Sequence, residues 1–310
     1  MSPEKRTINR AATRGFSIVP LLTPFQADGS LDEAAVRRLV EHVVTGGCQA
    51  VMVCGTTGEA ASMTLADRVR LLQLAVEHAA GRAMVFGGIG HNCQRDAIEL
   101  ASAFFRDGAA AVVAHLPSYY PIGAAEIEAY FTGLADRIAA PLYLYNIPQT
   151  TNHSIPLDVV ERLSRHPHIV GIKDSEPNAA RQEAVARQFA GRSDFSVFCG
   201  SIAFTVQAMR AGADGFVPSA ANVAPRVTRD AMDAWMRHDE AAALKAQERI
   251  AAVSATYQSG RNVPQALCAS KAALEVMGLA SRHMLPPLQS WTDAMVADLR
   301  DRLRAANLVS

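Results

Sequence analysis

Eight short apolar runs, each followed by a turn and an amphipathic helical stretch, constrain the fold of this 310-residue chain more than any other feature. The runs that we expect to form strands are Phe16–Thr23, Ala50–Cys54, Ala83–Gly88, Ala110–His115, Pro141–Tyr145, Ile169–Lys173, Phe195–Cys199 and Gly215–Pro218. Near-continuous apolar strands that alternate with helices indicate a parallel sheet covered on its faces. Eight such units predict a closed (β/α)8 barrel, the TIM barrel, in preference to an open sheet.

Helical patterns separate the apolar runs, and four more follow the eighth run. The patterns between the runs predict helices over Asp32–Thr45, Leu65–Ala79, Gln94–Arg106, Ala124–Ile138, Leu157–Arg165, Asn178–Phe189 and Phe204–Ala211. The later patterns are Arg226–His238, Asp239–Tyr257, Pro264–Met277 and Ser290–Ala306, which are too many for one closing helix. We therefore predict a flexible N-terminal tail over residues 1–14, the barrel over residues 15–238, and a C-terminal helical extension over residues 239–310 that packs on the barrel.

Composition excludes several classes of partner and site. Thirty basic and thirty acidic residues balance, which argues against binding to nucleic acid or to an anionic membrane. No stretch reaches the roughly 18 apolar residues that span a bilayer. The five cysteines are scattered and lack C-x-x-C spacing, as expected for reduced thiols in a cytoplasmic protein. His166 and His168 have no third ligand nearby in the sequence, so we expect a solvated loop there and no metal site.

Lys173 ends an apolar run in a chain that otherwise uses arginine for positive charge. Only four of the thirty basic residues are lysines. Arginine stays protonated in proteins, whereas burial disfavours the ammonium form of a lysine. A neutral amine attacks a ketone and forms a Schiff base. Two interpretations stay open on this run alone: a Schiff-base lysine, or a lysine at a strand end that pairs with Asp174.

Residues able to do chemistry follow the carboxyl ends of the predicted strands, where a barrel of this type places its catalytic groups. In chain order they are Gly55-Thr56-Thr57-Gly58-Glu59, Pro117-Ser118-Tyr119-Tyr120-Pro121, Tyr145-Asn146-Ile147-Pro148, Lys173, Gly200-Ser201 and Ser219-Ala220-Ala221-Asn222. We therefore expect a single site at one end of the barrel.

Three of these segments allow both a functional and a structural interpretation. The glycines, backbone N–H groups and hydroxyls of Gly55–Glu59 suit a carboxylate, but threonine also caps helices. Tyr145 carries a phenol that moves protons if it reaches the amine, and otherwise it is an ordinary buried tyrosine. Tyr119 and Tyr120 lie in a Pro-flanked loop, where a subunit contact competes with a catalytic role.

Taken together, the motifs resemble a known superfamily. GTTGE at Gly55, SYYP at Ser118, YNIP at Tyr145, GIKDS at Gly171, GS at Gly200 and AANV around Ala221 occur in order over about residues 16–277. This combination is similar to the dihydrodipicolinate synthase/N-acetylneuraminate lyase superfamily. Its members are pyruvate-handling class I aldolases and lyases, mostly tetramers built as dimers of dimers. The resemblance implies a homotetramer, a 2-oxo acid substrate such as pyruvate, and no metal or organic cofactor.

The resemblance also implies a role for each matching residue. Lys173 corresponds to the Schiff-base lysine and Tyr145 to the proton-shuttling tyrosine beside it. Thr57 corresponds to the residue that links this tyrosine by hydrogen bonds to Tyr119, which in family members reaches in from the neighbouring subunit. The residues implied to hold the pyruvyl carboxylate or to line the surroundings of the lysine are Thr56, Thr57, Gly200 and Val217.

Three departures from the superfamily patterns bear on the substrate. Dihydrodipicolinate synthases carry a carboxylate-binding arginine five residues beyond the active-site tyrosine, and this chain has Thr150 there. A threonine does not make the bidentate contact that arginine makes with a carboxylate. Ser118 stands where the synthases usually have the first tyrosine of their pair. The stretch Gly200–Phe204 lacks the acidic residues with which sialic acid lyases tend to grip sugar hydroxyls.

We therefore predict a class I aldolase or lyase that cleaves a 2-oxo-3-deoxy acid, or a 4-hydroxy-2-oxo acid, to pyruvate and an aldehyde. A 2-oxo-3-deoxy sugar acid dehydratase is an alternative that uses the same imine but releases no pyruvate. Dihydrodipicolinate synthase, which condenses pyruvate with aspartate semialdehyde, is another. A non-catalytic sensor of 2-oxo acids would bind pyruvate without turnover.

Overall fold

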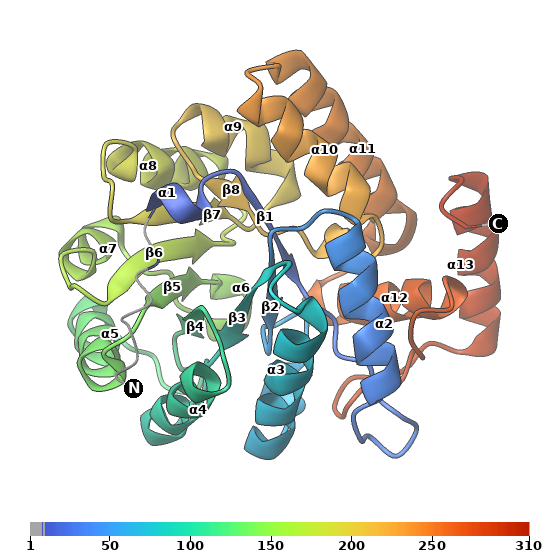
Figure 1. Cartoon of the computed structure of the whole chain (residues 1–310), viewed down its shortest axis with the longest axis horizontal. Helices are drawn as coiled ribbons and strands as arrows, with labels where there is room; N and C mark the ends of the chain where they lie inside the picture. Colours follow the sequence, from blue (N-terminus) through green and yellow to red (C-terminus); the bar gives the residue numbers. More distant parts are fainter. Residues whose placement is uncertain (1–7, 9, 310) are drawn as a thin grey trace. The chain divides into compact units, whose positions relative to one another are not determined.

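The computed structural model describes residue 8 and residues 10–309. Eight strands form a closed barrel in chain order (Figure 1). They are β1 (Phe16–Pro20), β2 (Ala50–Val53), β3 (Met84–Gly88), β4 (Ala111–His115), β5 (Leu142–Asn146), β6 (Ile169–Asp174), β7 (Ser196–Cys199) and β8 (Gly215–Phe216). The predicted (β/α)8 barrel is confirmed, and the strand ends differ from the predicted ones by a few residues at most.

Helices alternate with the strands and continue after the last one. Those found near the predicted positions are α2 (Glu33–Thr45), α3 (Leu65–Ala79), α4 (Gln94–Arg106), α5 (Ala124–Ile138), α7 (Leu157–Leu163), α8 (Ala179–Phe189), α9 (Thr205–Arg210), α10 (Pro225–Met236), α11 (Glu240–Gln258), α12 (Val263–Val276) and α13 (Asp293–Ala305). The sequence did not predict the short elements α1 (Arg10–Thr13), α6 (Pro148–Thr151), η1 (Ala60–Ser62), η2 (Ile202–Phe204) and η3 (Ser219–Asn222), three of which are 3-10 turns. Elements of three or four residues are too short to show a helical period.

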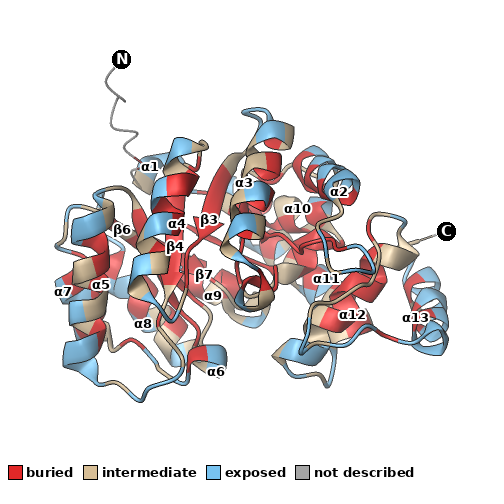
Figure 2. Cartoon of the chain, turned by 90° about the horizontal axis from the view of Figure 1, so that it is seen from below, coloured by how far each residue is buried: buried red, intermediate tan, exposed pale blue. Residues whose placement is uncertain are grey.

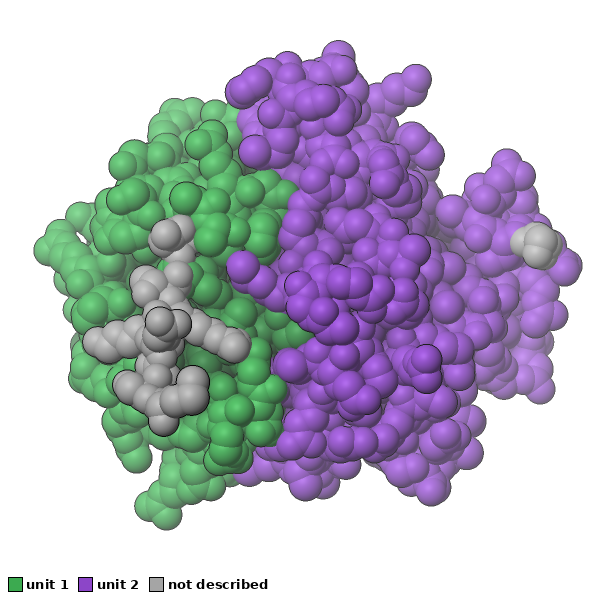
Figure 3. Space-filling view, viewed as in Figure 1, with its two compact units in different colours: residues 1–16, 85–217 green, residues 17–84, 218–310 purple. Residues whose placement is uncertain are grey.

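The chain divides into two compact units, coloured separately in Figure 3. Unit 1 comprises residues 1–16 and 85–217, and unit 2 comprises residues 17–84 and 218–310. The C-terminal helices α10 to α13 belong to unit 2, together with β2, α2, α3 and residues 17–20 of β1. The boundary predicted at residues 238 and 239 falls within unit 2, between α10 and α11, and stays a prediction.

The predicted flexible tail lies partly outside the described residues, which do not include residues 1–7 and 9. Residues 10–13 of it form the short helix α1. The Arg10 guanidinium lies 2.6 Å from the Asp214 carboxylate and donates to the carbonyls of Phe189 (2.5 Å) and Gly212 (2.6 Å). These charge-assisted hydrogen bonds order this part of the tail within unit 1.

Three aromatic rings pack against one another inside unit 1. The Tyr143 ring lies 5.6 Å from Phe86 and 5.8 Å from Phe198, measured between centroids, and all three side chains are buried. Burial of each such ring stabilises the fold by roughly 1.5–3 kcal/mol. Side chains two positions apart on a strand point to the same face, so Tyr145 projects from β5 on the same side as Tyr143.

In unit 2, α2 packs an apolar face inward, as the colouring in Figure 2 shows. Val36, Leu39, Val40 and Val43 recur at helical spacing and are fully buried. Asp32 caps the helix by accepting from the Ala35 N–H. On its outer face, Glu41 pairs with Arg82 at 2.7 Å, which ties α2 to the segment between α3 and β3.

Candidate active site

Lys173 and Tyr145 lie side by side on neighbouring strands of unit 1. The parallel pairing of β5 with β6 places Tyr145 opposite Lys173. The Lys173 ammonium nitrogen, Nζ, lies 4.1 Å from the centroid of the Tyr145 ring. Only 6% of Lys173 and 5% of Tyr145 is exposed. The pairing places an amine over a tyrosine ring in a buried environment, and these are the two side-chain types that imine chemistry with proton transfer uses.

Asp174 is not the partner of Lys173. Consecutive side chains on a strand point to opposite faces, and the Asp174 carboxylate lies 2.8 Å from Arg181 on α8. Burial raises the pKa of Asp174 above its usual value, and the Arg181 guanidinium opposes this. The interpretation of Lys173 as a lysine that pairs with Asp174 is therefore wrong.

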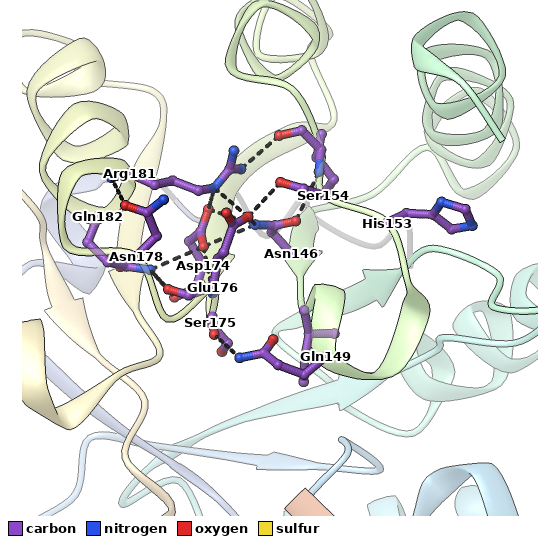
Figure 4. A network of polar contacts seen from close by, with 12 residues as sticks. Asn146, Gln149, His153, Ser154, Asp174, Ser175, Glu176, Asn178, Arg181 and Gln182 are labelled. Atoms are coloured by element: carbon purple, nitrogen blue, oxygen red, sulfur yellow. Dashed lines mark hydrogen bonds and ion pairs between the residues drawn. The ribbon is translucent and has the colours of Figure 1, made fainter. Parts of the chain in front are cut away.

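A network of polar side chains surrounds Asp174, and Figure 4 shows it from close by. The Asn146 amide donates to both Asp174 oxygens and to Glu176, each at 3.1 Å. The Asn146 side-chain oxygen in turn accepts from the Ile155 N–H at 3.0 Å. Because Asn146 follows Tyr145 and Asp174 follows Lys173, this network holds the ends of β5 and β6 in register beneath the two candidate catalytic side chains.

Sequence reasoning missed His115, which lies on the other side of Tyr145. Pairing of β4 with β5 places His115 opposite Tyr145, and the two rings meet edge to face at 6.4 Å between centroids. The His115 Nδ1 is 2.8 Å from the Leu116 carbonyl oxygen, so it carries the proton in that contact. The signal was available, since His115 is a titratable residue at the last position of an apolar run.

Gly200 and Val217 both lie near the carboxyl end of β7. A Cβ atom on Gly200 would meet the Ser175 hydroxyl oxygen at 1.9 Å, so glycine is required for Ser175 to lie where it does. The Val217 N–H donates to the Cys199 carbonyl at 2.8 Å, and Val217 is buried. Both residues therefore belong to unit 1 with Lys173, whose strand β6 pairs with β7.

Thr56 and Thr57 lie in unit 2, in a tight turn directly after β2. The turn is closed by the Gly58 N–H on the Gly55 carbonyl (3.1 Å) and by the Glu59 N–H on the Thr56 carbonyl (3.2 Å). The Thr23 hydroxyl donates to the Gly58 carbonyl at 2.7 Å. Thr56 and Thr57 are half-buried. The predicted link from Thr57 to Tyr145 and Tyr119 stays a prediction.

Tyr119 does not join the buried pair within one copy of the chain. It is 79% exposed, and Tyr120 beside it is 71% exposed. Their rings meet edge to face at 5.0 Å. Large exposed aromatic side chains are enriched in protein interfaces, which fits the subunit contact considered from the sequence.

The other nucleophiles near the strand ends are poorly suited to catalysis. Burial raises the pKa of Cys54 and of Cys199 to about 12, so both thiols are protonated at neutral pH. Lys271 is fully buried too, and burial lowers its pKa to about 8 despite the opposing effect of Glu59. However, its ammonium group lies 2.5 Å from the Glu59 carboxylate and donates to the His283 carbonyl at 2.6 Å. Lys271 is thus engaged, and Lys173 is the better candidate nucleophile.

Thr150 and Ser118, which differ from the synthase pattern, each make a local hydrogen bond. The Thr150 hydroxyl, in α6, donates to the Ile147 carbonyl at 3.3 Å. The Ser118 N–H donates to the Asn92 side chain at 3.0 Å. Arg181, the arginine of the network in Figure 4, is occupied by Asp174 and by the Ile155 carbonyl, so it does not take the place of an arginine at position 150.

Two general features complete the description of residue 8 and residues 10–309. Within them, no helix has both the length and the apolar character needed to cross a membrane. Nor do three His, Cys, Asp or Glu side chains come together there as ligands for a metal ion.

Comparison with known proteins connects this geometry to a family. The model of the dihydrodipicolinate synthetase family matches residues 14–306. The 4-hydroxy-tetrahydrodipicolinate synthase of Pseudomonas aeruginosa is 32% identical over 295 residues, which cover 95% of this chain and 99% of that protein. The synthase of Halorhodospira halophila is 33% identical over 298 residues, covering 94% and 97%. YagE, a prophage protein from E. coli solved with pyruvate, superposes with a TM-score of 0.88 at 27% identity, covering 94% of this chain and 99% of YagE.

The resemblance drawn from the sequence motifs is thus confirmed. The match extends over nearly the whole chain, on a barrel whose strands carry a buried lysine beside a tyrosine. Members of this family are lyases of the class I type, which work through a Schiff base on lysine. The chain belongs to the dihydrodipicolinate synthetase family and is an enzyme of this class I aldolase type.

Proposed function

We propose that this enzyme cleaves a 2-oxo-3-deoxy acid, or a 4-hydroxy-2-oxo acid, to pyruvate and an aldehyde. The observation that carries the proposal is the position of the Lys173 amine over the Tyr145 ring, with the neighbouring Asp174 turned away to Arg181. The pyruvate complex of YagE supports a pyruvyl group as the common part of the substrate.

The reaction follows from the chemistry of the two side chains. The neutral amine of Lys173 attacks the C2 ketone and forms a carbinolamine, and Tyr145 moves the protons as water leaves. The protonated imine then accepts the electron pair of the C3–C4 bond. Loss of the C4 hydroxyl proton releases an aldehyde and leaves an enamine, which is protonated at C3. Hydrolysis of the resulting imine releases pyruvate and restores the amine.

In the proposed reaction, the other predicted site residues bind the substrate or surround Lys173. The hydroxyls and backbone N–H groups of Thr56 and Thr57 bind the pyruvyl carboxylate, and Thr57 connects Tyr145 to Tyr119 of a neighbouring subunit. Gly200 and Val217 line the surroundings of Lys173. Two observations support these roles. The Thr56-Thr57 turn is half-buried, and Gly200 and Val217 lie near the carboxyl end of β7, the strand that pairs with the Lys173 strand β6.

Thr150 favours cleavage over the synthase reaction. Aspartate semialdehyde brings a second carboxylate, which an arginine binds through two parallel hydrogen bonds. At this position the chain offers only a threonine hydroxyl, which donates to its own backbone. The stretch Gly200–Phe204 also has no acid for the hydroxyl groups of a sialic acid.

Dihydrodipicolinate synthase is the second candidate because the curated relatives at 32% and 33% identity carry that name. Two assays separate the candidates. Release of pyruvate from a panel of 2-oxo-3-deoxy acids is expected, together with weak condensation of pyruvate with aspartate semialdehyde. Efficient condensation would favour the synthase, and turnover of the panel without pyruvate would favour a dehydratase. Binding of pyruvate without any turnover is the outcome that a sensor predicts.

We also propose a homotetramer in the cytoplasm. The exposed Tyr119 and Tyr120 supply an aromatic surface suited to a second copy of the chain. All five cysteines are free thiols, which is typical of proteins in a reducing compartment.

A further inference from the structure

A second buried lysine, Lys271 on α12, pairs with the last residue of the Gly-Thr-Thr-Gly-Glu turn. Its ammonium group lies 2.5 Å from the Glu59 carboxylate, and the side chains are 1% and 0% exposed. The same ammonium donates to the His283 carbonyl at 2.6 Å and lies 4.1 Å from the centroid of the Phe25 ring. All of these residues belong to unit 2.

A buried ion pair such as Lys271–Glu59 is an inefficient way to stabilise a fold. Taking two charges out of water is unfavourable, and apolar residues of similar size often replace a buried pair without loss of stability. Glu59 also has a left-handed backbone, with φ of 57°, a conformation that is unfavourable for residues other than glycine. Strain of this kind persists where the surroundings hold it in place and collects at functional sites.

The Lys271–Glu59 pair holds the Gly55–Glu59 turn through the last residue of that turn. The Glu59 N–H donates to the Thr56 carbonyl at 3.2 Å, so the position of Glu59 sets the backbone of Thr56 and Thr57. The second Glu59 oxygen accepts from the Leu285 N–H at 2.9 Å. Helix α12 and the segment around residues 283–285 therefore both contact the turn through the Glu59 carboxylate or its partner Lys271.

We infer that Lys271 and Glu59 are positioning residues, which hold the Thr56-Thr57 turn in the shape that binds the substrate carboxylate. The inference rests on the proposed role of that turn. It gives helix α12 a part in shaping the substrate site.

The test compares Lys271→Met and Glu59→Gln with the wild type and with a control, Lys245→Met, at an exposed lysine on α11. Pyruvate trapping by borohydride at Lys173 is measured over a range of pyruvate concentrations. Loss of a hydrogen bond to a charged group predicts that the half-saturating pyruvate concentration rises about tenfold or more in both variants. The trapping rate at saturation changes much less, and the control matches the wild type.

A double variant, Glu59→Gln with Lys271→Met, separates binding from folding. Removing one charge strands the other in the interior, whereas removing both relieves that penalty. The double variant is therefore expected to melt above either single variant while its half-saturating pyruvate concentration stays raised. If that concentration is normal in the double variant, or in folded single variants, the pair is only structural and the inference is wrong. Failure of the wild type to trap pyruvate would instead overturn the proposed function.

Discussion

Tyr145 is the residue whose role can be isolated most cleanly, because the same strand carries its control. Tyr145→Phe keeps the ring over Lys173 and removes only the hydroxyl. Proton transfer by a positioned group contributes about 10²–10⁴-fold to a rate, so kcat for pyruvate release is expected to fall by that factor. Steady-state kinetics on the best substrate of the panel measures it.

Tyr143→Phe is the matched control, since Tyr143 lies two positions earlier on β5 and is fully buried among Phe86 and Phe198. It is expected to keep kcat, because the Tyr143 hydroxyl is buried and takes no part in the proposed reaction. Equal losses of kcat in both variants would mean that Tyr145 acts through packing alone.

Thiol reactivity gives a second prediction at the residue scale. Burial raises the pKa of Cys48, Cys54 and Cys199 to about 12 and raises that of Cys268, whereas Cys93 is exposed. Only a thiolate attacks iodoacetamide, so the native enzyme at pH 8 is expected to gain a single label, at Cys93, without losing activity. Peptide mapping checks this. Rapid labelling of Cys199 with loss of activity would point to a thiol in the site.

At the scale of elements, the Glu41–Arg82 pair predicts how stability depends on pH. Hydrogen bonds from Arg82 and then from Thr45 lower the pKa of Glu41 from 4.5 to about 2. A folded-state pKa below the unfolded value gives stability that is present above pH 4.5 and is lost as the pH falls toward 2. Arg82→Met removes the main cause, so its free energy of unfolding is expected to fall less steeply over this range.

Arg95→Met, at an exposed arginine of α4, is the control for that measurement. Its free energy of unfolding should follow the wild-type pH dependence. If Arg82→Met follows the wild type as well, solvent screens the Glu41–Arg82 pair so strongly that it contributes nothing measurable.

Elements also show where sequence reasoning succeeds. Each strand of the barrel appears as an apolar run of at least four residues, and each long helix as a run with one apolar face, so both could be predicted. The short α6 and the 3-10 turns could not, because they span less than two helical turns. Lys173 and Tyr145 were predicted because each ends an apolar run in the sequence, and parallel strands end at one face of a barrel.

Contacts between distant parts of the chain were beyond the reach of sequence reasoning. Lys271 meets Glu59 only because α12 packs beside the turn after β2, and nothing in either local sequence indicates this. The same holds for Asp174, whose partner Arg181 lies on the next helix while Lys173 is adjacent in sequence. The direction of the side chains on β6 decides that Asp174 pairs with Arg181 and not with Lys173. The sequence alone left the role of Lys173 open.

At the scale of the whole molecule, the proposed tetramer makes Tyr119 a residue of the neighbouring site. A variant with Tyr119→Ala and Tyr120→Ala is expected to sediment as smaller species, because the aromatic surface between copies is lost. It is also expected to lose activity although Lys173 and Tyr145 are intact. Sedimentation velocity together with kinetics measures both effects. An active enzyme of unchanged size would place the subunit contact elsewhere.

The proposed reaction requires that Lys173 becomes covalently attached to the substrate, and trapping with pyruvate and borohydride measures this attachment. The wild-type enzyme is expected to gain the mass of one reduced pyruvyl group per chain, and peptide mapping is expected to locate this group at Lys173 and not at Lys271. Lys173→Ala is expected to gain no mass while it stays folded. A wild-type enzyme that gains no mass, or that carries the group on Lys271, would show that Lys173 is not the Schiff-base lysine.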